Sequence, residues 1–195
     1  MSGLKFLMLA GVALAGAVLA PPAPAGQLLA NPGFEAGDGG AGAAAWDLGG
    51  TSARETSLAR TGTASLRLGG AGSGTFDAVA AQSVAISTAL QYEASFYARW
   101  TPEFRASQRW FAVEWKDAGG ATLTQEVHPV GVAGAGTMWN FSGHYPLSPP
   151  PAAASARLSF ECRGITNGSY YVEDVALAQV PFDTLRNIGF EGPLA

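Results

Sequence analysis

The side chains that could carry out acid–base or metal chemistry are scattered along this sequence of 195 residues. Glu93, Glu114 and Glu126 lie in alternating apolar and polar segments, but no motif pairs two of them, as glycoside hydrolysis by two carboxyl groups requires. His128 and His144 are isolated, and no group of His and Cys residues has the spacing of a zinc site. The residue pattern therefore favours a protein that is not an enzyme.

Cys162 is the only cysteine, so no disulfide can form within one chain. It alternates with Leu158 and Phe160, which places its thiol on the apolar face of a predicted strand. A thiol in apolar surroundings stays protonated and unreactive. We predict that Cys162 is a buried packing residue and not a nucleophile.

Two strictly alternating segments carry pairs of side chains that could bind a ligand. Tyr97 and Arg99 lie opposite the apolar face of one segment, and Trp110 and Glu114 lie opposite the apolar face of the next. If these two strands are neighbours in one sheet, the four side chains form one surface of aromatic rings and charged groups. Such a surface suits sugar rings, which stack on aromatic faces and need polar partners for their hydroxyls. In the alternative, the two rings only cover a twisted sheet or pack under a loop.

The elements that must position these residues are short strands. Residues 92–100 and 109–115 alternate most clearly, and the turn at 116–120 predicts a hairpin with a return strand over 121–127. No window after residue 25 has a helical period. We predict one all-β domain over residues 26–180, an antiparallel β-sandwich of the jelly-roll type. The face predicted to point inward carries Phe96, Phe111, Val113, Trp115 and Trp139.

The first residues have the features of a signal peptide. Lys5 is followed by an apolar run over 6–20, which is short and rich in Ala and Gly for a membrane span. Small residues at Ala23 and Ala25 fit a cleavage site. We expect residues 1–25 to be removed from a secreted or cell-surface protein, with no membrane segment left. The net charge of −4 argues against nucleic acid and anionic lipid as partners.

One short stretch occurs twice. Residues 28–35 read Leu-Leu-Ala-Asn-Pro-Gly-Phe-Glu, an apolar strand followed by a turn signal. Residues 185–191 repeat Leu, Asn, Gly, Phe and Glu at the same spacing. Residues 181–195 therefore read as a linker and the first strand of a second module. A tail that folds back on its own domain is the alternative.

Five motifs in order resemble the jelly-roll carbohydrate-binding modules of families four, nine and twenty-two, within the wider galactose-binding-like fold. The resemblance covers residues 27–179 and is more specific for the fold than for the ligand. The motifs comprise the opening Leu29-x-Asn31-x-Gly33-Phe34-Glu35, then Gly62-x-x-Ser65-Leu66-x-Leu68, Gln82-x-Val84, Tyr92-x-x-Ser95-Phe96-x-Ala98-Arg99, and the closing Tyr171-x-Glu173-Asp174-Val175-x-Leu177.

The resemblance implies a structural Ca²⁺ ion that ties the opening motif to the closing one. Carried onto this sequence, its ligands are Glu35, either Asp174 or Glu173, and backbone carbonyls near Asn31 and Thr63. Mixed shells of carboxylate and carbonyl oxygens suit Ca²⁺. Glu173 departs from the family pattern, which usually has Asp there. The alternative is that these acidic residues are solvated edge residues.

Two functions of different classes follow. The first is a secreted, non-catalytic module that binds a poly- or oligosaccharide on a concave sheet face. The second is a structural or adhesive surface protein that assembles head-to-tail into filaments, with residues 184–191 added to the sheet of a neighbouring copy.

Overall fold

The computed structural model describes residues 26–70, 74–131 and 136–180. The predicted signal peptide and the terminal repeat lie outside the described residues. The described part of the chain forms ten strands and no helix; accordingly, it contains no helix of the length and apolarity that crossing a bilayer would need. The strands are β1 (Asp47–Gly50), β2 (Ser52–Glu55), β3 (Ser65–Gly69), β4 (Phe76–Ala85), β5 (Gln91–Trp100), β6 (Gln108–Lys116), β7 (Thr122–Pro129), β8 (Asn140–Leu147), β9 (Ser155–Ile165) and β10 (Ser169–Val180).

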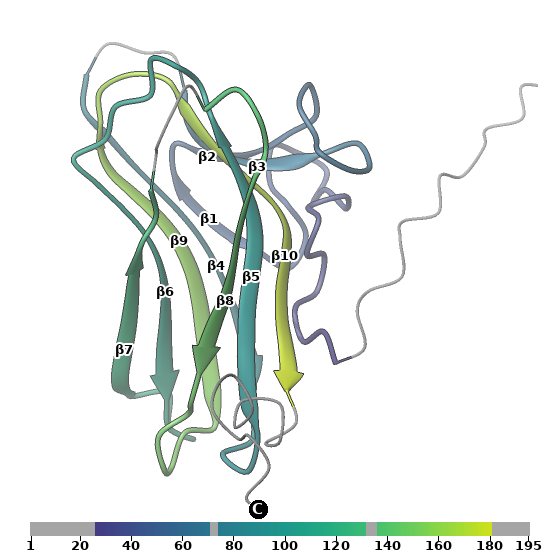
Figure 1. The fold of residues 1–195 in the computed structure, drawn as a ribbon, viewed down its shortest axis with the longest axis vertical. Helices are drawn as coiled ribbons and strands as arrows, with labels where there is room; N and C mark the ends of the chain where they lie inside the picture. The colour runs from purple at the N-terminus through teal and green to yellow at the C-terminus, as the bar shows by residue number, and fades with distance from the viewer. Residues whose placement is uncertain (1–25, 71–73, 132–135, 181–195) are drawn as a thin grey trace, which may run out of the picture.

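The strands form two sheets of five. The first sheet has the order β1-β4-β9-β6-β7, and the second has the order β2-β3-β10-β5-β8. Every neighbouring pair is antiparallel. In Figure 1, β8, β5 and β10 lie side by side in one layer, and β7, β6 and β9 lie in the other. This arrangement confirms the predicted all-β antiparallel sandwich.

Aromatic side chains fill the space between the sheets. Phe96 from the second sheet contacts Phe111 and Phe160 from the first, with ring centroids 5.6 Å and 4.9 Å away. Phe111 and Trp115 are almost fully buried, as the alternation of their segment predicts. Trp139 differs from its prediction as a core residue, because it lies just before β8 and is only half-buried.

The predicted hairpin joins β6 to β7. The Asp117 side chain accepts hydrogen bonds of 2.9 Å from the amides of Gly119 and Ala121, and Gly120 takes the positive φ of 84° that the turn needs. The hairpin sets the register that pairs Ala112 with Val127 and Glu114 with Gln125.

Candidate functional site

The four predicted ligand-binding residues do not lie on one surface. Trp110 and Glu114 are on β6 in the first sheet, whereas Tyr97 and Arg99 are on β5 in the second sheet. Each pair alternates with core residues of its own strand, so each points away from the core. The condition that the two strands are neighbours in one sheet is not met, because residues 101–107 carry the chain from one sheet to the other.

Trp110 and Glu114 share the outer face of the first sheet with a central row of small side chains. Ala81, Ser159 and Ala112 are paired in register across β4, β9 and β6. All three have an exposed fraction of 0%, although they point away from the core. Larger neighbours in the flanking rows must therefore cover them. The result is an outer face on which the side chains of the flanking rows close over the small central row.

The first flanking row contains the aromatic ring. Trp110 lies directly opposite Glu161 on β9. The Arg163 guanidinium carbon lies 5.4 Å from the centroid of the Trp110 ring, and its Nη2 is 3.0 Å from Glu161 Oε2. Ring, guanidinium and carboxylate are thus held together, and the Trp110 side chain is only partly buried.

The second flanking row is polar. Glu114 lies opposite Arg157, and the two are 3.4 Å apart between Oε1 and Nη1. Lys116 Nζ is 3.1 Å from the other carboxylate oxygen of Glu114. We call the surface formed by Trp110, Glu114, Arg157, Glu161 and the small central row the β6–β9 face. It offers one aromatic ring together with hydrogen-bond donors and acceptors of both charges.

Sequence reasoning missed the half of this face that β9 supplies. The alternation of Leu158, Phe160 and Cys162 identified the buried side of this segment. The same alternation places Arg157 and Glu161 on the outer side. The polar positions of β9 could therefore have identified Arg157 and Glu161 as further residues of the outer face.

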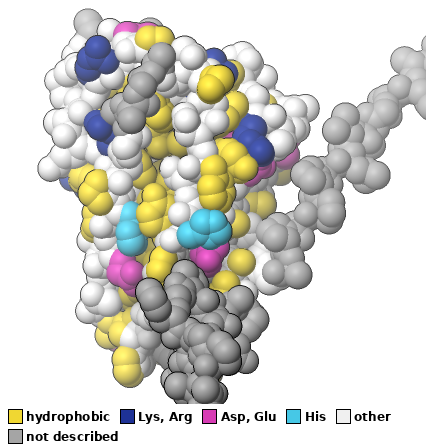
Figure 2. Space-filling view, viewed as in Figure 1, with side chains coloured by type: hydrophobic (Ala, Val, Ile, Leu, Met, Phe, Trp, Pro, Cys, Tyr) yellow, Lys and Arg dark blue, Asp and Glu magenta, His cyan; other side chains and the backbone are white. Residues whose placement is uncertain are grey.

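Tyr97 lies on the opposite outer face and has protein partners on that face. The Arg60 guanidinium carbon is 3.4 Å from the centroid of its ring, and Phe141 of β8 lies beside it at 5.1 Å between centroids. Because Arg60 covers one side of the ring, that side is not free to stack on a sugar. Figure 2 shows exposed hydrophobic side chains and two histidines on the side of the molecule that carries the edge strands β7 and β8.

The predicted metal ligands gather around residues 60–64. The Glu35 carboxylate accepts hydrogen bonds from the Thr63 amide at 2.9 Å, the Thr63 hydroxyl at 2.7 Å and the Ala64 amide at 3.3 Å. A Cβ at Gly62 would come within 2.2 Å of Glu35 Oε1, and Gly62 has a φ of 62°. Only glycine allows the turn to pass so close to this carboxylate.

Glu173 and Asp174 reach the same turn from β10. Glu173 has an exposed fraction of 0%, and its carboxylate accepts hydrogen bonds from the amides of Arg60 and Thr61. Burial raises the pKa of Glu173 against the lowering effect of these hydrogen bonds. Asp174 has a positive φ of 49° where the β10–β5 pairing shifts register, and its Oδ2 is 2.5 Å from Arg60 Nη1.

These residues suit Ca²⁺ in part. Three carboxylates lie around this turn, and the Arg60 guanidinium pairs only with Asp174, so a cation could compensate the remaining negative charge. The Asn31 carbonyl already accepts from the Phe34 amide and the Trp46 indole, both at 3.1 Å, so it is a poor ligand. Within the described ranges, no three His, Cys, Asp or Glu side chains are grouped closely enough to hold a metal together.

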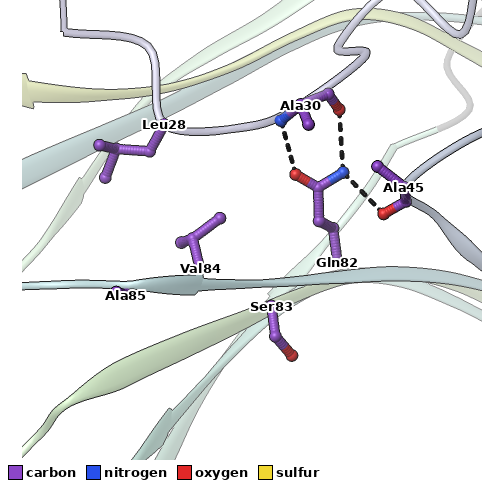
Figure 3. A pocket seen from close by; sticks show the side chains of 7 residues that line it. All are labelled: Leu28, Ala30, Ala45, Gln82, Ser83, Val84 and Ala85. Carbon is purple, nitrogen blue, oxygen red and sulfur yellow. Dashed lines mark hydrogen bonds between the residues drawn. The ribbon is translucent and has the colours of Figure 1, made fainter.

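A hollow beside β4 is closed by its own residues. Gln82 points toward the N-terminal segment in Figure 3 and exchanges hydrogen bonds with Ala30, at 2.7 Å to its amide and 2.9 Å to its carbonyl. The other hydrogen of the Gln82 amide group goes to the Ala45 carbonyl at 3.0 Å. The polar atoms of Gln82 are therefore satisfied within the protein. The hollow marks the place where β4 is hydrogen-bonded to the N-terminal segment and to Ala45.

Cys162 is buried at the junction of β4, β9 and β6, with an exposed fraction of 1%. Burial raises the pKa of its thiol to about 12. The thiol is therefore protonated at neutral pH, in agreement with its predicted role as a packing residue.

Solved structures share this fold. The chain is similar to TmCBM61, described in complex with β-1,4-galactotriose, with a TM-score of 0.53 and 16% identity over 79% of this chain and 99% of that one. It is also similar to the xylan-binding CBM22-1 domain of Xyn10C from Paenibacillus barcinonensis, with a TM-score of 0.54 and 21% identity over 82% of this chain and 98% of that one. The enzymatically active domain of tailspike protein 4 of bacteriophage CBA120 gives a TM-score of 0.59 at 16% identity over 79% of this chain.

The coverage of these structures differs. The chain spans nearly the whole of the two carbohydrate-binding modules but only 21% of the tailspike chain. No protein-family model and no curated protein sequence matches it. At these identities, the likeness establishes a fold that carbohydrate-binding modules also have.

Proposed function

We propose that this protein is a non-catalytic carbohydrate-binding module and that its β6–β9 face binds a poly- or oligosaccharide. The observation that carries the proposal is the half-buried ring of Trp110, with the charged side chains of Glu161 and Arg163 around it. A sugar ring can stack on the indole while its hydroxyls form hydrogen bonds with the charged groups.

The charged groups of the face support binding rather than catalysis. Glu161 is paired with Arg163, and Glu114 is paired with both Arg157 and Lys116. A glycosidase needs one carboxyl group that stays protonated and a second that is free to act as base or nucleophile. Carboxylates held by cations suit hydrogen bonding to sugar hydroxyls instead. Solved carbohydrate-binding modules of the same fold give the proposal further support.

The proposal is tested by screening the protein that begins at Gly26 against a glycan array, followed by calorimetric titration with each glycan retained. We expect dissociation constants in the micromolar range, since shallow polar sites gain little from burial. Release of reducing sugar from the same glycans is measured in parallel. The absence of any retained glycan would contradict binding, and steady release of reducing sugar would contradict a non-catalytic role.

We also propose that a structural Ca²⁺ ion is held by Glu35, by either Asp174 or Glu173, and by backbone carbonyls near Thr63. The ion would tie the opening segment to β10 across the turn at residues 60–64. The charge balance of this turn supports the proposal, whereas the occupied carbonyl of Asn31 removes that residue from the ligand set. Isothermal titration of chelator-treated protein with CaCl₂ tests it, with MgCl₂ as the control ion.

Secretion is proposed from the sequence of residues 1–25 alone. Expression of the complete chain in a bacterial host, with mass spectrometry of the exported product, tests it. A product that begins at Gly26 is expected, and a product that keeps residues 1–25 inside the cell would contradict the proposal.

A further inference from the structure

Residues 29–35 lie along the part of the β10 edge that β3 leaves unpaired, and we call this binding position the seat. β3 pairs only with the first half of β10, over Ser169–Val172, and the N-terminal segment lies along the second half. Leu29 and Phe34 are buried there, with exposed fractions of 5% and 0%. The Phe34 ring packs on Trp46 at 4.9 Å between centroids. The apolar half of the seat thus takes one Leu and one Phe.

Two polar side chains complete the contacts of this segment. The Asn31 side-chain amide donates to the carbonyls of Ala36 at 2.8 Å and Ala44 at 3.0 Å, and its oxygen accepts from the Ala36 amide at 2.9 Å. Glu35 accepts from the amide and the hydroxyl of Thr63. The Asn31 bonds close the turn of the segment itself, whereas Leu29, Phe34 and Glu35 make the side-chain contacts with the rest of the domain.

The terminal repeat keeps the residues that the seat uses and changes those that it does not use. Ala30 corresponds to Arg186, and Ala30 is exposed. Pro32 corresponds to Ile188, and the hydrogen bond that Pro32 makes comes from its carbonyl, which accepts the Val175 amide at 3.0 Å. Any residue supplies that carbonyl. The retained residues are Leu185, Asn187, Gly189, Phe190 and Glu191.

The repeat follows β10 at a distance that suits a hairpin. Gln27 pairs antiparallel with Ala178, next to the seat. If Leu185 took the place of Leu29, Asp183 would take the place of Gln27 and would lie opposite Ala178. Residues 179–182 would then form a loop of four, a common length for a β-hairpin. The repeat can reach the seat of its own chain when Gln179 and Val180 leave their pairing with Tyr92 and Gln91 of β5.

We propose that residues 185–191 are a second occupant of this seat, in competition with residues 29–35 of the same chain. Both segments are tethered next to the seat, so neither needs a second molecule, and the Leu, Phe and Glu contacts are available to both. When the C-terminal segment is bound, the N-terminal segment is released with its Leu and Phe exposed. The seat is therefore a switch between two closed forms of one domain.

The test is a double-mutant cycle in the protein that begins at Gly26 and ends at Ala195, with thermal midpoints as the readout. Phe34→Ala alone is expected to lower the midpoint by only a few degrees, because Phe190 can replace the lost ring. Phe190→Ala alone is expected to change nothing measurable. The double variant is expected to lose about 10 °C or more, the shift typical of an unfilled buried Phe site in a domain of this size. Leu194→Ala, outside the repeat, is the matched control.

If Phe34→Ala lowers the thermal midpoint equally in the protein with Phe190 and in the Phe190→Ala variant, the proposal is overturned. If the double variant does not fold, the Phe34→Leu and Phe190→Leu pair gives the same cycle with a smaller cavity. The midpoint of Phe34→Ala is also measured over a hundredfold range of protein concentration. A constant midpoint supports exchange within one chain. A midpoint that rises with concentration, together with oligomers in size-exclusion chromatography, would overturn it in favour of strand donation between copies.

Discussion

Trp110 on β6 and Glu161 on β9 lie directly opposite each other, with the Arg163 guanidinium in contact range of both. This arrangement fixes one side of the indole and leaves the ring partly exposed. If sugars bind here, Trp110→Ala removes the stacking surface, and we expect affinity for a retained glycan to fall about tenfold or more. Calorimetric titration measures the change.

The matched control for this variant is Tyr97→Ala. Tyr97 is also an aromatic residue of a strand, but it lies on the opposite outer face under Arg60. We expect Tyr97→Ala to keep full affinity. Loss of affinity in Tyr97→Ala with full affinity in Trp110→Ala would move the site to the second sheet.

The covered central row of small side chains leads to a second prediction. Ala112 has no exposed surface, yet its Cβ points away from the core, between Ser159 and Val127. In Ala112→Phe the ring would rise from the middle of the β6–β9 face and block a bound sugar. We expect affinity to be lost while the free energy of unfolding falls by the cost of local crowding, about 1–3 kcal/mol, so that the domain stays folded.

Ser95→Phe is the control for steric blocking. Ser95 lies on β5 and points outward from the second sheet, so a ring there is remote from the β6–β9 face. Both variants are compared by titration with the same glycan and by circular dichroism. Retained binding in Ala112→Phe would show that the sugar does not cross the central row.

The Arg60 side chain competes with the proposed Ca²⁺ ion for the Asp174 carboxylate. Its guanidinium contacts Asp174 at 2.5 Å, so a bound cation must displace or repel it. We expect Arg60→Gln to raise the affinity for Ca²⁺, whereas Arg60→Lys keeps the charge and leaves the affinity closer to that of the parent protein. Titration with CaCl₂ compares the three proteins. If chelator leaves the melting midpoint of all three proteins unchanged, the calcium proposal is contradicted.

The parts of this structure that sequence predicts are those that depend on local periodicity. Alternation places Phe96 and Phe111 inward because a strand turns successive side chains to opposite faces. Alternation carries no information about which strands become neighbours. Tyr97 and Trp110 therefore both point outward as predicted, but they lie on opposite sides of the sandwich, because the chain changes sheets between β5 and β6.

The turn at residues 60–64 illustrates the same limit for the carboxylates. Glu35 and Glu173 are distant in sequence, and no periodic pattern links them. They meet because the segment before β3 offers amide groups to both carboxylates, Thr61 to Glu173 and Thr63 to Glu35. Backbone donors of a turn leave no mark in residue types beyond Gly62. The resemblance to known modules therefore supplied this pairing, and local pattern could not.

Glu173 makes stability depend on pH in a direction opposite to that of an ordinary paired carboxylate. Burial raises the pKa of Glu173 in the folded state above its unfolded value, and the neighbouring Asp174 adds to the rise. The folded state then binds the proton more tightly than the unfolded chain does. The stabilisation is complete below the unfolded pKa, about 4.3, and is lost as the pH rises through the folded pKa.

Substitution of Glu173 isolates the contribution of its carboxyl group to the pH dependence of stability. In chelator, we expect the free energy of unfolding of Glu173→Gln to lack the part of the pH slope that Glu173 contributes above about pH 4.3, at most about 1.4 kcal/mol per pH unit. Urea unfolding of both proteins between pH 4 and 8 measures the difference, which cancels the carboxylates they share. Added Ca²⁺ favours the ionised carboxylate, so it should stabilise the parent protein more as the pH rises and leave Glu173→Gln less affected. Identical pH slopes for the two proteins in chelator would mean that Glu173 titrates alike in the folded and unfolded states.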